Sequence, residues 1–264
     1  MASTIKHTFI ILAYQNSPYL PECIQSLLNQ TTPSLIRLST STPSDYITAL
    51  SQKYNIPLLI NPNPHGIAAD WSFAYQSCET EYLTLAHQDD LYLPEYTELY
   101  LAAATKYKKN LIIFSDYNEL YHNQIRDNNL LLLFKRLLLN LFFLFKQNLS
   151  SAGYKKKILS FGNPVCCPSI MYHVKNIGPF TFNSSYTMNL DWDAALRLSG
   201  MQGDFVYVKR KLLTRRIHEG SESTNALTNR TRHEEDRRIF ERLWPAWFAG
   251  WLSLCYKLAY KSNG

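Results

Sequence analysis

The sequence lacks the features that mark a secreted, membrane-spanning or nucleic-acid-binding protein. Its N-terminus runs directly into a strand-like segment without a basic region or a cleavage site, so we expect no signal peptide. No basic stretch interleaved with aromatic residues appears, which argues against a nucleic-acid partner. Charged residues make up 18% of the chain and hydrophobic residues 46%, a composition typical of a globular protein and not of a disordered one.

Cysteine is scarce and irregularly placed. The five cysteines are an odd number without a C-x2-C pair, and Cys166-Cys167-x5-His173 does not have the spacing of a zinc site. We therefore expect structural thiols in a reducing compartment, and a cytoplasmic location. The other three cysteines are Cys23, Cys78 and Cys255.

The chain has an excess of positive charge. A formal charge of +6 favours an anionic partner, either a phosphorylated substrate or an acidic membrane surface. A length of 264 residues is enough to bury a sizeable core, and one domain with an appendage is the expected organisation.

Strand-like and helix-like segments alternate through the first ninety residues, which predicts an α/β fold with a mostly parallel sheet and helices on both faces. The same pattern continues more loosely toward the C-terminus. Strands are expected at 8–14, 34–40, 56–60, 83–87, 111–116, 165–172 and 204–208, and helices from about 20, 45, 67, 95, 189 and 228.

One strand ends in adjacent carboxylates, in the segment His87-Gln88-Asp89-Asp90. Parallel sheets bind ligands at the carboxyl ends of their strands, and two acids at that edge repel each other unless a divalent cation lies between them. Since side chains two apart on a strand project to the same side, His87 and Asp89 are expected to face one ligand. The alternative is a solvated turn in which Asp90 caps the helix that follows Pro94.

A second segment, from Leu130 to Phe145, is almost wholly Leu and Phe. Its length and the charges of Lys135 and Arg136 argue against a membrane-spanning helix. A broad apolar face beside cations, including Lys155-Lys156-Lys157, favours a helix that lies in a membrane interface. The alternative is a helix buried under a lid or against a partner. The C-terminal helix has two interpretations as well, a membrane-interface helix or a helix packed on the core. Its aromatic residues Trp244, Trp247, Phe248 and Trp251 precede Lys257 and Lys261.

The order of these features resembles glycosyltransferase family 2, a group of nucleotide-sugar-dependent enzymes with the GT-A fold, across roughly residues 5 to 225. A hydrophobic and basic insertion at 130–158 and a helical extension at 226–264 would be additions to that domain. The resemblance is carried by the segments Phe9 to Asn16, Asn61-x-Asn63-x-x-Gly66-Ile67-Ala68, His87 to Asp90, Leu190-Asp191-x-Asp193-x-x-x-Arg197 and Arg216 to Ser221.

The resemblance implies a role for each matching residue. Asp191 would be the catalytic base, while Asp193 would be a capping or supporting acid. A metal ion, Mg²⁺ or Mn²⁺, would be held by Asp89 and Asp90, with His87 and His218 as further candidates. The nucleotide-sugar donor would be bound by Ala13, Tyr14, Asn16, Asn61, Gly66, Asp70, Gln88 and Arg216.

The sequence departs from the family pattern at four places. His87 replaces the first aspartate of the D-x-D motif, and Leu190 replaces a frequent glutamate. The hydroxyls of 39–42 stand where an aspartate after the second strand often helps to bind the nucleotide, and Asp70 and Trp71 stand where many members carry polar or basic residues. The implied activity is inverting sugar transfer from a nucleotide sugar, expected to be UDP-linked, to a glycan or lipid-linked acceptor in cell-surface polysaccharide or glycolipid synthesis. The alternatives are a catalytically weak nucleotide-sugar-binding regulatory or scaffolding subunit and, less favoured, a nucleotidyltransferase, which would need a Gly-rich basic phosphate loop.

Overall fold

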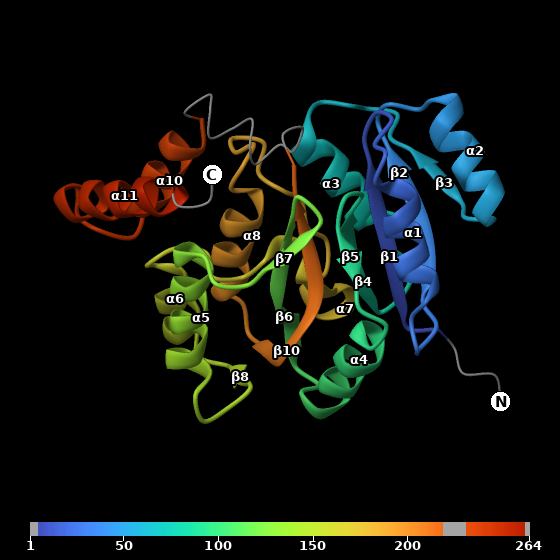
Figure 1. Ribbon diagram of the computed structural model, residues 1–264. Coiled ribbons are helices and arrows are strands. Elements are labelled where there is room, and N and C mark those ends of the chain that lie inside the picture. The colour runs from blue at the N-terminus through green and yellow to red at the C-terminus, as the bar shows by residue number, and fades with distance from the viewer. Residues whose placement is uncertain (1–4, 219–230, 262–264) are drawn as a thin grey trace.

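The N-terminal half is a series of strand–helix units in the order predicted. The computed structural model describes residues 5–218 and 231–261, and the ribbon in Figure 1 follows the same order of elements. Two local signals explain where helices begin: the Ser44 hydroxyl accepts a hydrogen bond from the Ile47 N–H, and Gly66 takes a φ of +87° directly before its helix. The elements are β1 (His7–Ala13), α1 (Leu20–Leu28), β2 (Leu35–Thr40), α2 (Asp45–Tyr54), β3 (Leu58–Ile60), α3 (Ile67–Gln76) and β4 (Tyr82–His87).

The C-terminal half is less regular. Its elements are β5 (Leu91–Tyr92), α4 (Tyr96–Lys106), β6 (Asn110–Tyr121), β7 (Gln124–Arg126), α5 (Leu130–Phe143), β8 (Asn148–Leu149), α6 (Ala152–Leu159), the 3-10 turn η1 (Cys167–Ser169), β9 (Met171–His173), α7 (Val174–Ile177), α8 (Leu190–Ser199), β10 (Asp204–Ile217), α10 (Thr231–Glu241) and α11 (Ala246–Lys261).

Ten strands within the described residues form one sheet, whose main path runs β3-β2-β1-β4-β9-β6-β10-β5. The pairs β1–β2, β1–β4, β2–β3 and β6–β10 are parallel, whereas β9 lies antiparallel between β4 and β6. The predicted mostly parallel α/β sheet is therefore confirmed.

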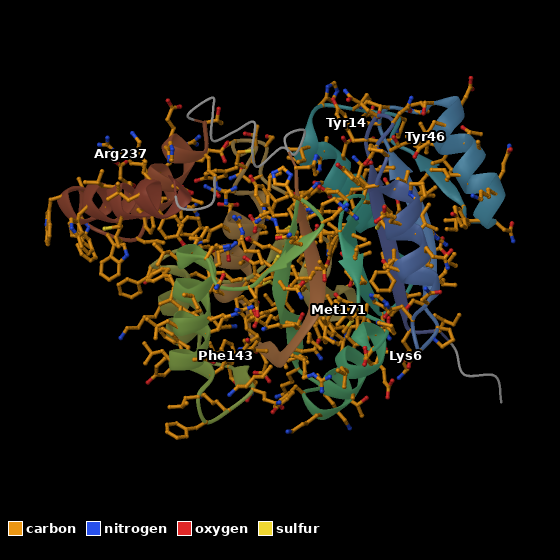
Figure 2. All side chains as sticks on the ribbon, in the orientation of Figure 1. Lys6, Tyr14, Tyr46, Phe143, Met171 and Arg237 are labelled. Atoms are coloured by element: carbon orange, nitrogen blue, oxygen red, sulfur yellow. The ribbon has the colours of Figure 1, made fainter. Side chains whose placement is uncertain are left out.

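Side chains alternate between two cores, one on each face of the sheet. Phe9 and Ile11 of β1 belong to the core shared with α1, α2 and α4, whereas Ile10 belongs to the core shared with α3, α5, α6 and α8. In Figure 2, Lys6 and Tyr14 lie at opposite ends of β1, with Tyr14 at the upper edge of the sheet. The upper edge is therefore the carboxyl end of β1.

Two strand predictions were wrong in extent. The segment predicted as a strand at 165–172 is mostly a turn, because Pro168 has no N–H to donate to a ladder and only Met171–His173 pairs with β4 and β6. The strand predicted at 204–208 continues to Ile217, with register shifts between Val208 and Leu213.

The apolar segment forms helix α5, which is buried on one side only, and a membrane contact of its other side stays a prediction. One face is buried in the core, while the opposite face is exposed, including Leu137 at 63% and Leu141 at 68%. No described helix is long and apolar enough to cross a membrane. The buried residues are Leu131, Leu132, Leu138, Leu139 and Phe143.

The C-terminal helices α10 and α11 pack beside α8 at the left of Figure 1. Ile239, Phe240 and Tyr256 join the same core as Trp192 of α8. The predicted boundary between residues 225 and 226, and the motif residues Glu219, Gly220 and Ser221, lie outside the described residues.

Candidate active site

One cavity of about 650 Å³ opens at the carboxyl ends of β1, β2 and β4, where an α/β sheet of this kind binds ligands. Segments far apart in sequence complete it, from α5, α8, β10 and α10. Of the predicted site residues, Asn16 and Asn61 are not among those lining it. The predicted residues that line the cavity are Ala13, Tyr14, Gly66, Asp70, His87, Gln88, Asp89, Asp90, Asp191, Arg216 and His218.

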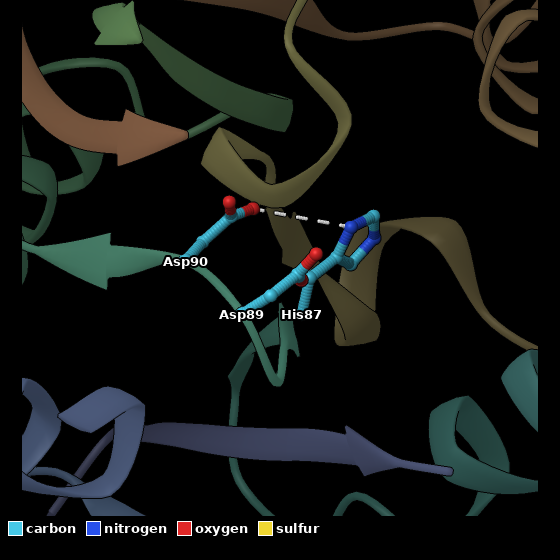
Figure 3. Close-up of side chains that lie close together, drawn as sticks. All are labelled: His87, Asp89 and Asp90. Carbon is cyan, nitrogen blue, oxygen red and sulfur yellow. Dashed lines mark ion pairs between the residues drawn. The ribbon is translucent and has the colours of Figure 1, made fainter. Parts of the chain in front are cut away.

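His87, Asp89 and Asp90 form a compact group in this cavity. One ligand atom from each lies within 4.8 Å of the others, the only such group of three found among residues 5–218 and 231–258. Figure 3 shows the Nδ1 of His87 facing the Oδ2 of Asp90, 3.9 Å away. His218 adds to the group, since its Nε2 lies 3.2 Å from the Oδ2 of Asp89.

The reason predicted for this grouping was wrong in one respect. Strand β4 ends at His87, so Asp89 and Asp90 lie in the turn beyond it, and the turn rather than strand alternation brings them to the imidazole. The alternative in which Asp90 caps α4 was also wrong. Asp90 is buried, and its Oδ1 accepts a hydrogen bond from the Arg216 N–H at 2.9 Å.

The two carboxyls have opposite electrostatic environments. Burial raises the pKa of Asp90 well above its ordinary value, and the neighbouring charge of Asp89 adds to the effect. Burial acts in the same direction on Asp89 and is the largest single effect, but the hydrogen bond from His218, the charges of His87 and His218 and a backbone hydrogen bond together hold the pKa of Asp89 below its usual value. Burial also lowers the pKa of His87, which favours the neutral imidazole that can bind a metal. This donor set fits Mg²⁺ or Mn²⁺, whose charge would allow both carboxyls to ionise.

Arg216 holds the acidic turn in place. Its Nε donates to the Asp89 carbonyl at 3.1 Å, and its guanidinium pairs with Glu22 at 2.5 Å and lies over the ring of Tyr19. Arg216 therefore positions the acidic turn while it lines the cavity.

The residues expected to bind the nucleotide support one another. The Gln88 amide exchanges two hydrogen bonds with the Tyr14 backbone, at 2.9 and 3.1 Å. Asp70 accepts from Ser41 at 2.7 Å and from Asn61 at 2.8 Å, so Asn61 acts through Asp70. Asn16 accepts from Ser44 at 2.7 Å, outside the cavity lining. The hydroxyl residues Ser39, Thr40, Ser41 and Thr42 all line the cavity.

Asp191 lines the same cavity from the first turn of α8. Its Oδ2 accepts a hydrogen bond from Asn163 at 2.8 Å. Burial raises the pKa of Asp191, the direction expected for a base in a partly desolvated site, while Arg232 and Lys135 oppose this shift. Asp193 is different: it is buried and accepts a hydrogen bond from Arg242 at 2.6 Å, outside the cavity.

The start of α8 is fixed by a residue from the C-terminal helices. The carboxylate of Glu235 accepts hydrogen bonds from the backbone N–H groups of Thr187, Met188 and Asn189, at 2.7 to 2.9 Å. A carboxylate at this position satisfies donors that a helix start leaves open. Glu235 therefore positions the turn that carries Asp191.

Several cavity residues were missed by sequence reasoning. Cys167 lies 3.7 Å from the Nε2 of His87, and Asn163 holds Asp191, but no local pattern marks either one. Lys135 does have a signal, since it interrupts an apolar helix, but that charge by itself argues only against a membrane-spanning helix. The others are Tyr117, Arg215 and Arg232.

The sequence itself matches a known family. Residues 8–177 match the family model described as Glycosyl transferase family 2, which is more than half of the chain. The chain belongs to glycosyl transferase family 2. The predicted resemblance is therefore confirmed. A comparison with curated proteins found no match.

Solved structures of glycosyltransferases share the fold. The S. aureus TarS 1–349 structure aligns with a TM-score of 0.63 at 13% identity, covering 89% of this chain and 64% of that one. The same protein in complex with UDP-GlcNAc aligns with a TM-score of 0.63 at 14% identity, over 89% and 65%. The mannosyltransferase PcManGT from Pyrobaculum calidifontis, in complex with GDP-Man and Mn²⁺, aligns with a TM-score of 0.61 at 12% identity, over 97% and 72%. This family 2 chain thus spans less than two thirds of the TarS 1–349 length.

Proposed function

We propose that this protein is an inverting, metal-dependent glycosyltransferase that moves a hexose from a nucleotide sugar to a hydroxyl of a glycan or lipid-linked acceptor. The observation that carries this proposal is that two acidic centres line one cavity, the pair Asp89 and Asp90 from the turn after β4 and Asp191 from the start of α8. The acidic pair would serve a donor diphosphate, and Asp191 would serve an acceptor hydroxyl.

The two acidic centres would have separate tasks. Asp89, Asp90 and His87, with His218 behind Asp89, would hold Mg²⁺ or Mn²⁺. When bound, the ion supplies positive charge to the diphosphate leaving group. Asp191 would remove the proton from the acceptor hydroxyl as that oxygen attacks the anomeric carbon, and Asn163 would orient its carboxylate. Inversion follows from a single in-line displacement by that oxygen.

The donor is proposed to be UDP-linked. The hydroxyls of 39–42, the Tyr14 backbone and Asp70 line the end of the cavity nearest to β1 and β2 and would contact the nucleoside. TarS has been solved with UDP-GlcNAc and with UDP, and PcManGT with GDP-Man, so related folds hold nucleotide sugars. Regulatory binding without turnover is the main alternative; the presence of Asp191 in the cavity favours the enzyme. A nucleotidyltransferase is less favoured, since the sequence has no Gly-rich basic loop after the first strand.

We also propose that the exposed apolar face of α5 and α11 lies against an anionic membrane surface, where lipid-linked acceptors for cell-surface glycans are found. Trp247 and Trp251 of α11 are exposed along with Leu137 and Leu141 of α5. The charge distribution supports this partner, because no acidic residue occurs at 128–190 or at 242–264. The exposed cations Lys146, Lys156 and Lys157 would meet lipid phosphates.

Two cations do not contribute to this surface as the sequence suggested. Lys155 is buried, and its ammonium donates to the carbonyls of Met201 and Gly203 at 2.7 Å each. Arg136 pairs with Asp116 and Asp127. The reason is geometric: adjacent helical residues point in different directions, so a run of cations cannot face one partner.

Nucleotide binding tests the catalytic proposal. UDP with Mn²⁺ should raise the melting temperature of the wild-type protein, and Asp89→Asn should remove that stabilisation because it weakens both ion and diphosphate binding. Asp45→Asn, an exposed aspartate at the start of α2, is the control. If UDP with Mn²⁺ raises the melting temperature of Asp89→Asn as much as that of wild type, the ion is not held by Asp89. Hydrolysis or transfer of a UDP-sugar then separates an enzyme from a regulatory binder.

Vesicle binding tests the membrane proposal. Leu137→Ser with Leu141→Ser should reduce co-sedimentation with anionic vesicles, and raised salt should weaken wild-type binding. Ile60→Ser changes an exposed apolar residue on β3, at the far side of the sheet in Figure 1, and should have no effect. Unchanged binding of the double variant would exclude α5 as the contact.

A further inference from the structure

The cavity is lined by cations as well as by carboxylates. Asp191 is close enough to Lys135 and Arg232 for their charges to act on its pKa. Arg215 also lines the cavity, and Glu119 lies 3.9 Å from it. Lys135 differs from the arginines in how few contacts its charge makes.

Lys135 enters the cavity from a helix that is otherwise apolar. The two cations of α5 are adjacent and have different partners. Arg136 makes ion pairs with Asp116 at 2.9 Å and with Asp127 at 2.5 Å. Lys135 instead lines the cavity, and its Nζ lies 3.5 Å from the hydroxyl of Tyr117.

This environment is unfavourable for an ammonium group without a ligand. Lys135 makes no ion pair within the described part of the chain, and a phenol at 3.5 Å is a weak partner. Burial lowers the pKa of Lys135, and the nearby guanidinium groups of Arg215 and Arg232 lower it further, against Cys166 and Asp191. An oxyanion brought by a substrate would supply the missing countercharge.

We propose that Lys135 forms a subsite for a phosphate group carried by the acceptor, in the part of the cavity that it shares with Asp191. A lysine ammonium is a compact point charge suited to a phosphate. The phosphate can belong to a lipid phosphate or to a phosphorylated polyol; the chemistry at Lys135 is the same. That this phosphate belongs to the acceptor rests on the proposed function, but the capacity of Lys135 to bind phosphate does not.

Phosphate binding is therefore measured without turnover. Glycerol phosphate is titrated into wild-type protein and into Lys135→Met, Lys135→Arg and Lys53→Met, with and without UDP and Mn²⁺, by calorimetry and thermal shift. With UDP bound, the donor site is filled, so further binding of glycerol phosphate reports on another site. If UDP does not bind, the result contradicts the proposed function, while the titration without UDP still tests the subsite.

Lys135→Met should weaken glycerol phosphate binding roughly tenfold or more, because a charge-assisted hydrogen bond is lost, while Lys135→Arg retains most of the affinity. The control Lys53→Met, at an exposed lysine of α2, should bind as wild type does. Without ligand, Lys135→Met should be at least as stable as wild type, since a poorly paired ammonium has been removed. No binding by wild type, equal binding by Lys135→Met, or unfolding of that variant would overturn the subsite.

The source of the phosphate is distinguished by two further ligands. A short-chain isoprenyl phosphate that binds more tightly than glycerol phosphate, while the matching isoprenol does not bind, assigns the subsite to a lipid-linked acceptor. Equal affinity for the two phosphates assigns it to a phosphorylated polyol. In both cases Lys135→Met must lower the affinity of the protein for the phosphate that binds to wild type.

Discussion

Asp191 and Asp193 lie two residues apart on α8, yet they should respond to the same substitution in opposite ways. Asp191→Asn removes the proposed base, so transfer should slow by roughly 10²–10⁴-fold while UDP affinity stays near that of wild type. The fold should not suffer, because an asparagine oxygen can still accept the hydrogen bond from Asn163.

The stability of Asp191→Asn follows from the pKa of the carboxyl. Burial raises this pKa, so the folded protein holds the proton more tightly than the unfolded chain does. As the pH rises through the window between the unfolded and the folded pKa, the free energy of unfolding therefore falls. Because asparagine cannot ionise, the free energy of unfolding of the variant does not fall over this pH window for that reason. At neutral pH the variant should be as stable as wild type or more so, and near pH 3 the difference should vanish.

Asp193→Asn should show the reverse pattern. The carboxylate of Asp193 is 1% exposed and lies 2.6 Å from Arg242, but the Arg242 side chain is 46% exposed, so solvent screens the pair. We expect a loss of about 1–2 kcal/mol, which in a chain of this size lowers Tm by roughly 2–8 °C. Transfer per folded molecule should change little.

Both variants are compared with wild type in two assays, thermal unfolding at several pH values and transfer from a UDP-sugar under saturating UDP-sugar and Mn²⁺. The reasoning fails if folded Asp193→Asn abolishes transfer while Asp191→Asn spares it, which would put the base two residues away. It also fails if Asp191→Asn is markedly less stable than wild type at neutral pH.

Three further substitutions test how the cavity is supported. Lys155→Met should lower the free energy of unfolding by about 2–4 kcal/mol in a denaturant titration, because two buried carbonyls lose a charged donor, whereas the exposed Lys156→Met should be neutral. Gly162→Ala should expose α11 to limited proteolysis, since an added Cβ would lie 1.6 Å from the hydroxyl of a tyrosine in that helix and φ is +134°. Glu235→Gln should reduce both stability and transfer rate because the start of α8 loses its anionic acceptor, and the exposed Glu234→Gln should change neither in the same assays.

The donor half of the fold could be predicted because its signals are local. Alternating strand and helix segments up to Asp90 fix a parallel sheet, and parallel strands bring their carboxyl ends to one edge. The acidic turn and the hydroxyls of 39–42 therefore came together as expected. Only the structural cause differs from the predicted one, since a turn rather than strand alternation brings Asp89 and Asp90 close to His87.

The acceptor half depended on contacts that no local pattern records. Lys155 faces the core because the carbonyls of Met201 and Gly203, far along the chain, accept hydrogen bonds from its ammonium. Arg232 lines the cavity from α10, which follows the last strand of the sheet. The strand β9 pairs antiparallel between two strands that come earlier in sequence, and three residues of apolar sequence cannot specify that. Long-range packing decided these positions.

The hydrogen bonds of Glu235 to the turn before Asp191 have a consequence for the order in which the enzyme matures during synthesis. The strands that form the donor end are complete once the ribosome has passed β10, but α10 is among the last elements to be made. A nascent chain can therefore assemble its nucleotide-binding edge before the turn that carries Asp191 acquires its anchor. Competence for donor binding should precede competence for transfer, and premature termination before Thr231 should yield a protein that holds a nucleotide sugar without passing the sugar on.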